Sequence, residues 1–326
     1  MYDEFGGRET CRAISTRFYA RVANDPVLRP LFSKSFTCAI EEFAAFLAQF
    51  LGGPCQDAQR RWWLSLHESH RRFKIGPVHR NAWLNLMTET LDEIDLPDTH
   101  KATLRAFFDR SSAYLIDQPN AQPIPILANH WEHQLQLDQA VAAIRQCNPD
   151  APTLVTAFRE NAAIFAGLLT LFIRSGQALE YVTGAIDASL ANIPHSFHRT
   201  LLHEAAGAGR GEIVRHLLQL GATPNGGLQP PLYSVANECR KPQEGAAIVR
   251  ALIDAGANVN FQGNHQQTTP LHMAARQGFL EIAQALLDSG ALVNLRARNG
   301  DTPLRRAINC KRPLVAQLLR QHQATL

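Results

Sequence analysis

At 326 residues the chain is long enough for two or more domains, each with its own core. Its 32 Lys and Arg residues nearly balance 29 Asp and Glu residues, which argues against nucleic acid or an anionic membrane as a partner. The six cysteines form no CxxC pair, so we expect reduced structural thiols and no disulfide framework. The start of the chain is not basic, and the longest apolar run, 162–173, is about half a transmembrane span. We therefore expect a cytoplasmic protein with no membrane contact.

The first segment has the spacing of α-helices. Ile14, Phe18 and Val22 recur at steps of four, which places them on one face of a helix over 12–22. The same spacing predicts helices over 41–51, 79–94 and 101–115. No stretch of this segment alternates as a β-strand would, so the sequence predicts an all-α fold.

Prolines and polar residues then separate this segment from the rest. Pro119, Pro123 and Pro125 predict a stiff, extended linker, so we place the first domain at 1–118 and the linker at 119–130. Helical patterning returns over 135–144, 154–173 and 179–190. The region 131–196 carries no chemical motif, and the sequence leaves it as a helical adaptor or as degenerate repeats.

The last segment repeats itself. Thr269-Pro270-Leu271-His272 recurs in part as Thr302-Pro303-Leu304-Arg305, an interval of 33 residues from position 269 to 302. This phrase and this period resemble ankyrin repeats, an α-solenoid, and the resemblance implies about four repeats over 197–326. The threonines are expected to cap the first helix of their units. Gly221, Gly256 and Gly290 are expected to end the second helix in a left-handed conformation.

Motifs of the first third of the chain follow the order and approximate spacing of one globin family. They are Tyr2-Asp3 with Gly6-Gly7, Phe18-Tyr19, Gly52-Gly53-Pro54, the run Ser69 to Ile75, and Trp83. Together they resemble truncated haemoglobins, most closely the group II type. The resemblance implies a haem b cofactor whose iron is held by His70, a residue type that suits iron. His67, three residues earlier, would share the helical face of His70 and is the alternative ligand.

The same resemblance implies how a gas ligand would be held. Tyr19 matches a tyrosine whose hydroxyl donates a hydrogen bond to iron-bound dioxygen, and Trp83 matches a tryptophan whose indole N–H points into the same pocket. Ala39 aligns with the distal position where many globins have histidine, and alanine cannot form that bond. Tyr19 and Trp83 would therefore carry the role, although core packing is an alternative for each.

Further contacts to the haem are implied for apolar and cationic side chains. The apolar ones are Phe32, Phe43, Phe46, Phe73, Trp83 and Met87, and the cationic ones, toward the propionates, are Arg71 and Arg72. Core packing accounts equally well for Phe46, and a solvated face accounts equally well for the arginines.

These inferences favour a haem protein for binding or transport of oxygen and other diatomic gases, with an ankyrin array that binds another protein. The two parts together suggest a gas or redox sensor. Loop tips including Phe261, Asn264, Arg296 and Asn299 are candidate contacts with the partner. We expect a ligand-binding protein more than an enzyme. The alternatives are a peroxidase or nitric-oxide dioxygenase, which would need a separate reductase, and an ankyrin scaffold with a haem-less globin.

Overall fold

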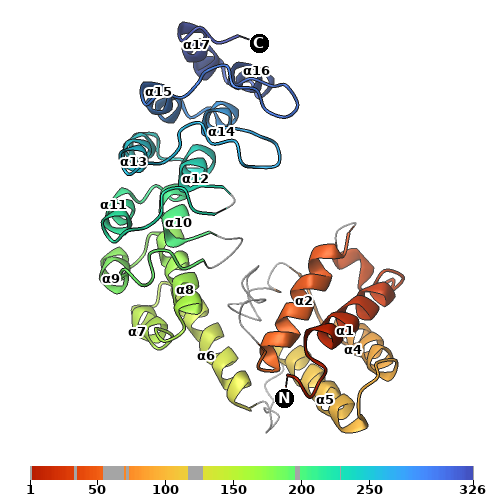
Figure 1. The fold of residues 1–326 in the computed structure, drawn as a ribbon. Helices are drawn as coiled ribbons and strands as arrows, with labels where there is room; N and C mark the ends of the chain where they lie inside the picture. The colour runs from red at the N-terminus through yellow and green to blue at the C-terminus, as the bar shows by residue number, and fades with distance from the viewer. Residues whose placement is uncertain are drawn as a thin grey trace. The chain divides into compact units, whose positions relative to one another are not determined.

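The computed structural model describes residues 2–32, 35–53, 70, 73–116, 128–194, 199–227 and 229–325. These residues form sixteen α-helices and one short 3-10 helix, and none of them lies in a β-strand, which confirms the all-α prediction. The chain divides into two compact units, 1–148 and 149–326 (Figure 1). Within the described ranges, no helix combines the length and apolar character needed to cross a bilayer.

The first unit is built on helices that pack through their apolar faces. Its helices are α1 (Gly7–Val22), η1 (Arg29–Leu31), α2 (Thr37–Phe50), α4 (Pro77–Asp92), α5 (Asp98–Leu115) and α6 (Ala128–Arg145). The predicted stripe on α1 is in the core, since Ile14, Phe18 and Val22 are each at most 1% exposed. Helix α1 packs against α2 and α4, and α4 packs against α5. The Ser15 hydroxyl also donates to the Ile40 carbonyl at 2.7 Å, which joins α1 to α2.

The backbone geometry explains why two of the motif positions, Gly6 and Gly53, are glycine. Gly6 precedes α1 with φ = 78°, a left-handed conformation that costs most residues free energy. Gly53 follows α2 where the chain passes close to the N-terminal segment. A Cβ at Gly53 would lie 2.7 Å from the Tyr2 ring and 2.8 Å from the Ala48 carbonyl oxygen. The motif residues Tyr2 and Gly53, far apart in sequence, therefore form one contact.

Helix α6 belongs to the first unit. It begins at Ala128, in the last residues of the predicted linker 119–130, and continues into the region 131–196. Tyr114 of α5 donates a hydrogen bond of 2.7 Å to the Asp138 carboxylate of α6, and Leu135 packs against the core of the first unit. The division between the units after Asn148 thus runs through the region 131–196.

The second unit is an array of helix pairs. Its helices are α7 (Ala151–Thr156), α8 (Ala162–Ser175), α9 (Leu179–Ala185), α10 (Leu201–Gly207), α11 (Gly211–Gln219), α12 (Pro231–Glu238), α13 (Pro242–Asp254), α14 (Pro270–Gln277), α15 (Leu280–Asp288), α16 (Pro303–Asn309) and α17 (Pro313–Gln321). Each even-numbered helix from α8 to α16 packs against the next even-numbered one, forming an inner row, while α11, α13, α15 and α17 pack in an outer row (Figure 1).

The predicted ends of the repeat helices are confirmed. The Thr269 hydroxyl accepts the His272 N–H at 3.3 Å, and the Thr302 hydroxyl accepts the Arg305 N–H at 3.3 Å, so both threonines cap an inner helix. The glycines that follow the outer helices, Gly221, Gly256 and Gly290, have φ values of 84°, 92° and 88°. These values lie in the left-handed region that glycine adopts without strain.

Asparagine side chains link the turn of each repeat to the turn of the next. Asn225 donates to the Gly256 carbonyl and accepts the Asn258 N–H, both at 2.8 Å. Asn260 makes the equivalent pair with Gly290 and Leu292, and Asn294 makes it with Gln323 and Thr325.

The same link occurs one unit earlier. Asn192 donates to the Gly221 carbonyl at 3.0 Å and accepts the Thr223 N–H at 2.8 Å. Asn192 follows the pair α8 and α9, which lies in the region that the sequence leaves open between an adaptor and degenerate repeats. The turn within this pair also matches a later one: Arg210 donates to the Ile173 carbonyl at 3.0 Å as Arg312 does to the Arg276 carbonyl at 3.2 Å.

In each of these turns the arginine crosses a glycine with positive φ, Gly176 or Gly278. We therefore propose that residues 162–194 are a repeat of the array. Two predicted helices differ from the structure here. The helix predicted over 179–190 ends at Ala185, and 154–173 is not one helix. Helix α7 ends at Thr156, and α8 begins after Asn161, whose side chain accepts the Ile164 N–H at 3.2 Å and so caps a new helix.

Candidate functional site

The site begins at His70, the predicted iron ligand. Its side chain is half-buried, and its ring centre lies 6.4 Å from that of Phe73. The Phe73 N–H donates to the His70 carbonyl at 2.9 Å. Phe73 then contacts Phe32, with ring centres 6.0 Å apart. The segment that carries His70 therefore meets the loop that follows η1.

Tyr19 lies at the centre of a group of aromatic rings. Its ring centre is 5.4 Å from those of Phe32 and Phe36, and 6.3 Å from that of Phe43 on α2. Arg29 braces the loop, because it donates to the Phe32 carbonyl at 3.0 Å and its guanidinium carbon lies 5.0 Å from the Phe36 ring centre. Helix α1 thus presents the Tyr19 ring to the same loop that contacts Phe73.

Trp83 joins this group from α4. Its ring centre lies 5.2 Å from those of Phe18 and Phe108 and 6.2 Å from that of Phe43. Phe43 stacks in turn on Phe46 at 6.5 Å. An unbroken series of ring contacts therefore runs from His70 to Trp83.

The degree of burial separates a wall from a core. Phe18 and Phe108 are 1% and 2% exposed and lie in the core. Other rings are packed against that core but only partly buried. Those of the aromatic series and its neighbours are Tyr19, Phe32, Phe36, Phe43, Phe46 and Trp83. Large aromatic rings with an imidazole beside them fit a flat apolar cofactor such as haem, which needs apolar walls and an axial ligand.

Two further predicted residues lie outside this series of ring contacts. Met87 is 1% exposed and packs inside the core of the first unit, while Ala39 is half-buried in the first turn of α2. Arg71, Arg72 and the alternative ligand His67 lie outside the described residues.

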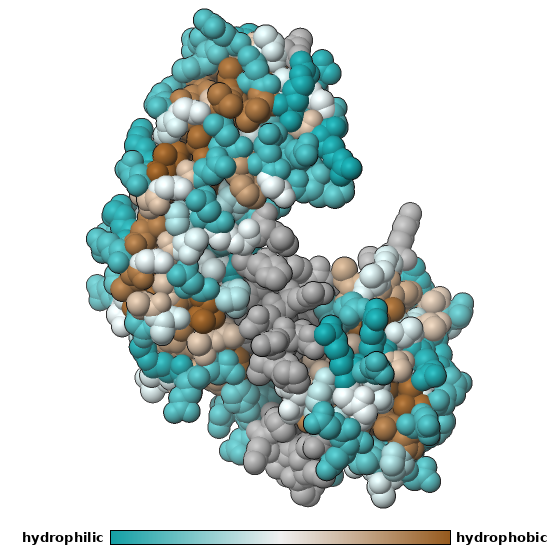
Figure 2. All heavy atoms as spheres, in the orientation of Figure 1, coloured by the Kyte–Doolittle hydropathy of each residue, from teal (hydrophilic) through white to brown (hydrophobic). Residues whose placement is uncertain are grey.

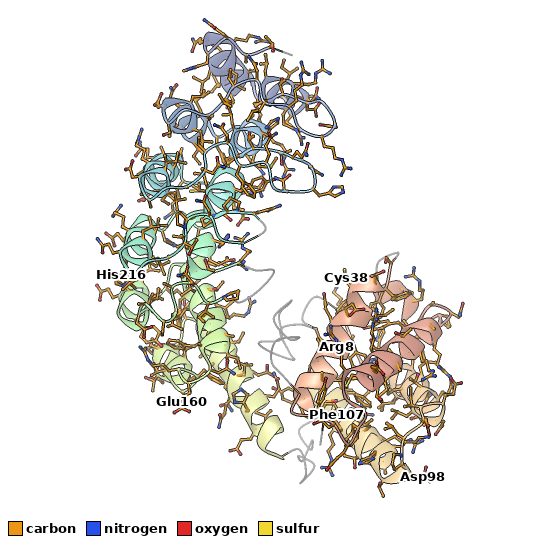
Figure 3. The ribbon with its side chains drawn as sticks, viewed as in Figure 1. Arg8, Cys38, Asp98, Phe107, Glu160 and His216 are labelled. Carbon is orange, nitrogen blue, oxygen red and sulfur yellow. The ribbon has the colours of Figure 1, made fainter. Side chains whose placement is uncertain are left out.

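Phe107 anchors this part of the unit from α5 (labelled in Figure 3), with its ring centre 4.0 Å from that of Phe50 on α2. Phe18, predicted in the stripe on α1 and in the motif Phe18-Tyr19, contacts Tyr19. The sequence analysis did not single out Phe36, which also contacts Tyr19.

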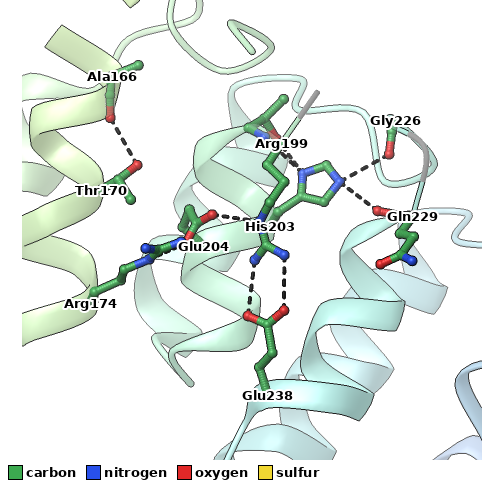
Figure 4. Close-up of polar contacts among 10 residues, drawn as sticks. Ala166, Thr170, Arg174, Arg199, His203, Glu204, Gly226, Gln229 and Glu238 are labelled. Carbon is green, nitrogen blue, oxygen red and sulfur yellow. Dashed lines mark hydrogen bonds and ion pairs between the residues drawn. The ribbon is translucent and has the colours of Figure 1, made fainter. Parts of the chain in front are cut away.

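The second unit holds a buried ionic network at its first inner helices. Glu204 of α10 is 2% exposed on its side chain and pairs with Arg174 of α8 at 2.6 Å and with Arg199 at 2.7 Å. Arg199 also binds both carboxylate oxygens of Glu238 on α12, at 3.0 and 3.1 Å (Figure 4). Burial disfavours the charge of Arg199, but its two carboxylate partners outweigh this and raise its pKa. The network joins three consecutive inner helices.

His203 lies beside this network and is 1% exposed. Its Nδ1 accepts the Thr200 N–H at 3.0 Å, and its Nε2 lies 3.2 and 3.0 Å from the carbonyl oxygens of Gly226 and Gln229 (Figure 4). Burial, together with the nearby charge of Arg199, lowers the pKa of His203 to about 4. The imidazole is therefore neutral at pH 7, and it holds the loop between α11 and α12 against α10.

Comparisons with known proteins agree with both units. Residues 1–114 match the family described as bacterial-like globin. The chain is 28% identical over 116 residues to group 2 truncated hemoglobin YjbI of Bacillus subtilis, covering 36% of this chain and 88% of that protein. It is 35% identical over 114 residues to group 2 truncated hemoglobin 3-1 of Lotus japonicus, covering 34% of this chain and 67% of that protein.

The second unit matches ankyrin repeats, at residues 197–226 and, as three copies, at 232–326. Over 126 residues the chain is 37% identical to human ankyrin repeat and SOCS box protein 16, which covers 39% of this chain and 27% of that protein. The chain is therefore a globin joined to ankyrin repeats. Its globin part belongs to the truncated haemoglobin family, with group 2 proteins as its homologues.

Proposed function

We propose that the first unit binds haem b and, through it, dioxygen or another diatomic gas, while the ankyrin array binds a protein partner. The observation that supports the proposal is the series of ring contacts that connects His70, the expected axial ligand, to Tyr19 and Trp83, the expected donors. The similarity to group 2 truncated hemoglobins supports the same conclusion.

The chain's own residues would each have a defined part. His70 would bind the iron through an imidazole nitrogen, and Phe32, Phe43, Phe46 and Phe73 would cover the porphyrin and exclude water. The haem supplies the metal centre to which the gas binds.

The hydroxyl of Tyr19 and the indole N–H of Trp83 are the hydrogen-bond donors in this series of rings. Such donors would stabilise negative charge on a polar gas ligand, and the apolar rings beside them would strengthen that effect by keeping water away. Tyr19 and Trp83 contact Phe43 from opposite helices, α1 and α4, so one aromatic ring would position both donors.

The presence of both units in one chain suggests a sensor, in which the gas changes the affinity of the array for its partner. Such a coupling requires that the partner bind the gas-loaded and gas-free proteins with different affinities. Equal affinity in the two states would leave gas binding and protein binding as separate functions.

Absorption spectra of the full chain reconstituted with haemin test the haem proposal. The wild-type protein should show a Soret band that shifts between its ferric, ferrous and carbon monoxide forms, and His70→Ala should lose stable haem. His79→Ala is the matched control, because His79 accepts the Gly76 N–H at 3.2 Å as a cap of α4. If His70→Ala retains haem with an unchanged spectrum, the ligand assignment is wrong, and His67→Ala becomes the decisive variant.

A further inference from the structure

Charge is distributed unevenly along the inner side of the ankyrin array. We define finger 3 as residues 258–269 and finger 4 as residues 291–302, the loops that precede α14 and α16. Fingers 3 and 4, together with their inner helices and the turns after them, cover residues 258–279 and 291–312 and contain seven Lys and Arg residues but one acidic residue, Asp301. We call the seven cations the basic face: Arg276, Arg296, Arg298, Arg305, Arg306, Lys311 and Arg312.

The corresponding part of the first two repeats is different. There, Arg199 is bound by Glu204 and Glu238, so its charge is compensated within the fold. In residues 258–279 and 291–312 the single carboxylate, Asp301, is 18% exposed on its side chain, accepts a hydrogen bond of 2.8 Å from Asn299, and lies 3.8 Å from Arg306. The two segments therefore carry six more positive than negative charges, seven cations against one carboxylate, which favours a negatively charged ligand.

Hydrogen bonds between the two fingers make this surface rigid. The Arg298 N–H donates to the Gln266 carbonyl at 2.9 Å, and the Arg298 guanidinium donates to the His265 ring at 3.2 Å. The Gln262 amide donates to the Arg296 carbonyl at 2.9 Å and to the Gln267 carbonyl at 2.8 Å. A surface held in this way loses little conformational freedom when a ligand binds to it.

The basic face is accessible and has an apolar residue beside it. Arg276, Arg298 and Arg305 are exposed, and Ile308, one turn after Arg305 on α16, is 41% exposed. Figure 2 shows hydrophilic residues gathered over the fingers of the last repeats. Arg305 stands where the earlier inner helices have His203 and His272, so the substitution adds a surface cation at this helix.

We propose that the basic face binds an acidic segment of a partner protein, with an apolar side chain of that segment seated on Ile308. This inference rests on the proposed function of the array in protein binding and adds the chemical class of the partner. Arginine favours this role because its planar guanidinium can bind both oxygens of a carboxylate at once. Acidic residues spaced along an extended segment would match cations on both finger 4 and α16.

Fluorescence anisotropy with the full haem-loaded chain and three labelled peptides tests the proposal. The first peptide is rich in Asp and Glu with two Leu residues, the second has Gln at every acidic position, and the third has Lys there. We expect the acidic peptide to bind best, with an affinity that falls as salt is added. The double variant Arg298→Glu, Arg305→Glu should weaken its binding about tenfold or more, since each reversal turns attraction into repulsion.

The matched control is Arg250→Glu, Arg320→Glu, which changes the net charge equally on the outer helices α13 and α17 and should leave binding unchanged. Equal binding of the Gln and acidic peptides would overturn the acidic preference while leaving protein binding by the array intact. Equal loss in both double variants would overturn the location. Tighter binding of duplex DNA, or of phosphatidylserine-containing vesicles, through the same arginines would overturn the partner class.

Discussion

Lowering the pH should destabilise the ankyrin array through one buried imidazole. Burial and Arg199 hold the pKa of His203 at about 4 in the folded protein, whereas an unfolded histidine has its ordinary value of 6.5. Between these values the unfolded chain binds a proton that the folded chain does not. The stabilising effect is therefore complete above pH 6.5 and is lost progressively as the pH falls to 4. The full loss is about 3 kcal/mol, and His272, whose pKa burial also lowers, adds to it in the same direction.

Urea unfolding at several pH values between 7.5 and 4.5 measures this effect. The four tryptophans, at positions 62, 63, 83 and 131, belong to the first unit, so tryptophan fluorescence follows the unfolding of that unit. A loss of far-ultraviolet circular dichroism without a change in tryptophan fluorescence therefore reports unfolding of the repeats. The variant His203→Gln should be less stable at pH 7.5 and should show a weaker pH dependence. His265→Gln, which removes an exposed histidine on finger 3, should keep the wild-type dependence. An NMR titration that finds the His203 ring of the folded protein protonating near pH 6.5 would refute the reasoning.

Two further outcomes follow from single contacts. Tyr19→Phe should speed the release of dioxygen from the ferrous protein, because it removes one hydrogen-bond donor and keeps the ring packed against Phe32 and Phe43. Stopped-flow measurement of the dissociation rate tests this, and an unaltered rate would leave Trp83 as the donor. Asn192→Ala and Asn225→Ala should each lower the free energy of unfolding of the array by about 1 kcal/mol, since each asparagine bonds two backbone groups of the next turn. A clearly smaller loss of unfolding free energy for Asn192→Ala would argue against a repeat at 162–194.

Periodicity and local rules were enough to predict most of the helices and their ends. The stripe of Ile14, Phe18 and Val22 is buried as expected, and Thr269 caps its helix. These features depend on residues within one or two turns of each other, so the sequence reports them directly. Glycine at position 256 likewise predicts a left-handed backbone conformation, because few other residues adopt a positive φ without strain.

Features that depend on distant contacts were harder to predict. Phe36 lies before α2, outside any helical pattern, and its ring contacts that of Tyr19 on α1. Met87 shares a predicted helix face with Trp83, but the structure buries it in the core, since a step of four residues rotates gradually around a helix. The ring contacts between helices that connect His70 to Trp83 are set by packing, which spacing alone does not reveal.

The proposed repeat at 162–194 was left open by the sequence, between an adaptor and degenerate repeats, for a different reason. Its inner helix lacks the Thr-Pro-Leu-His phrase and begins after Asn161, so a search for the phrase passes over it. A fainter signal was present, since Gly176 and Gly209 are separated by the same 33 residues as Asn192 and Asn225. These residues preserve the turns of the unit, and the turns are where one repeat bonds to the next.

The asparagine links couple each repeat of the array to its nearest neighbour. Each link spans a single boundary, so disruption at one position passes to the adjacent unit and weakens with each boundary beyond it. Fraying would start where a unit has a neighbour on one side only and would advance inward one helix pair at a time. A partner that binds across the units containing Asn260 and Asn294 would stabilise the hydrogen bonds of these two asparagines most.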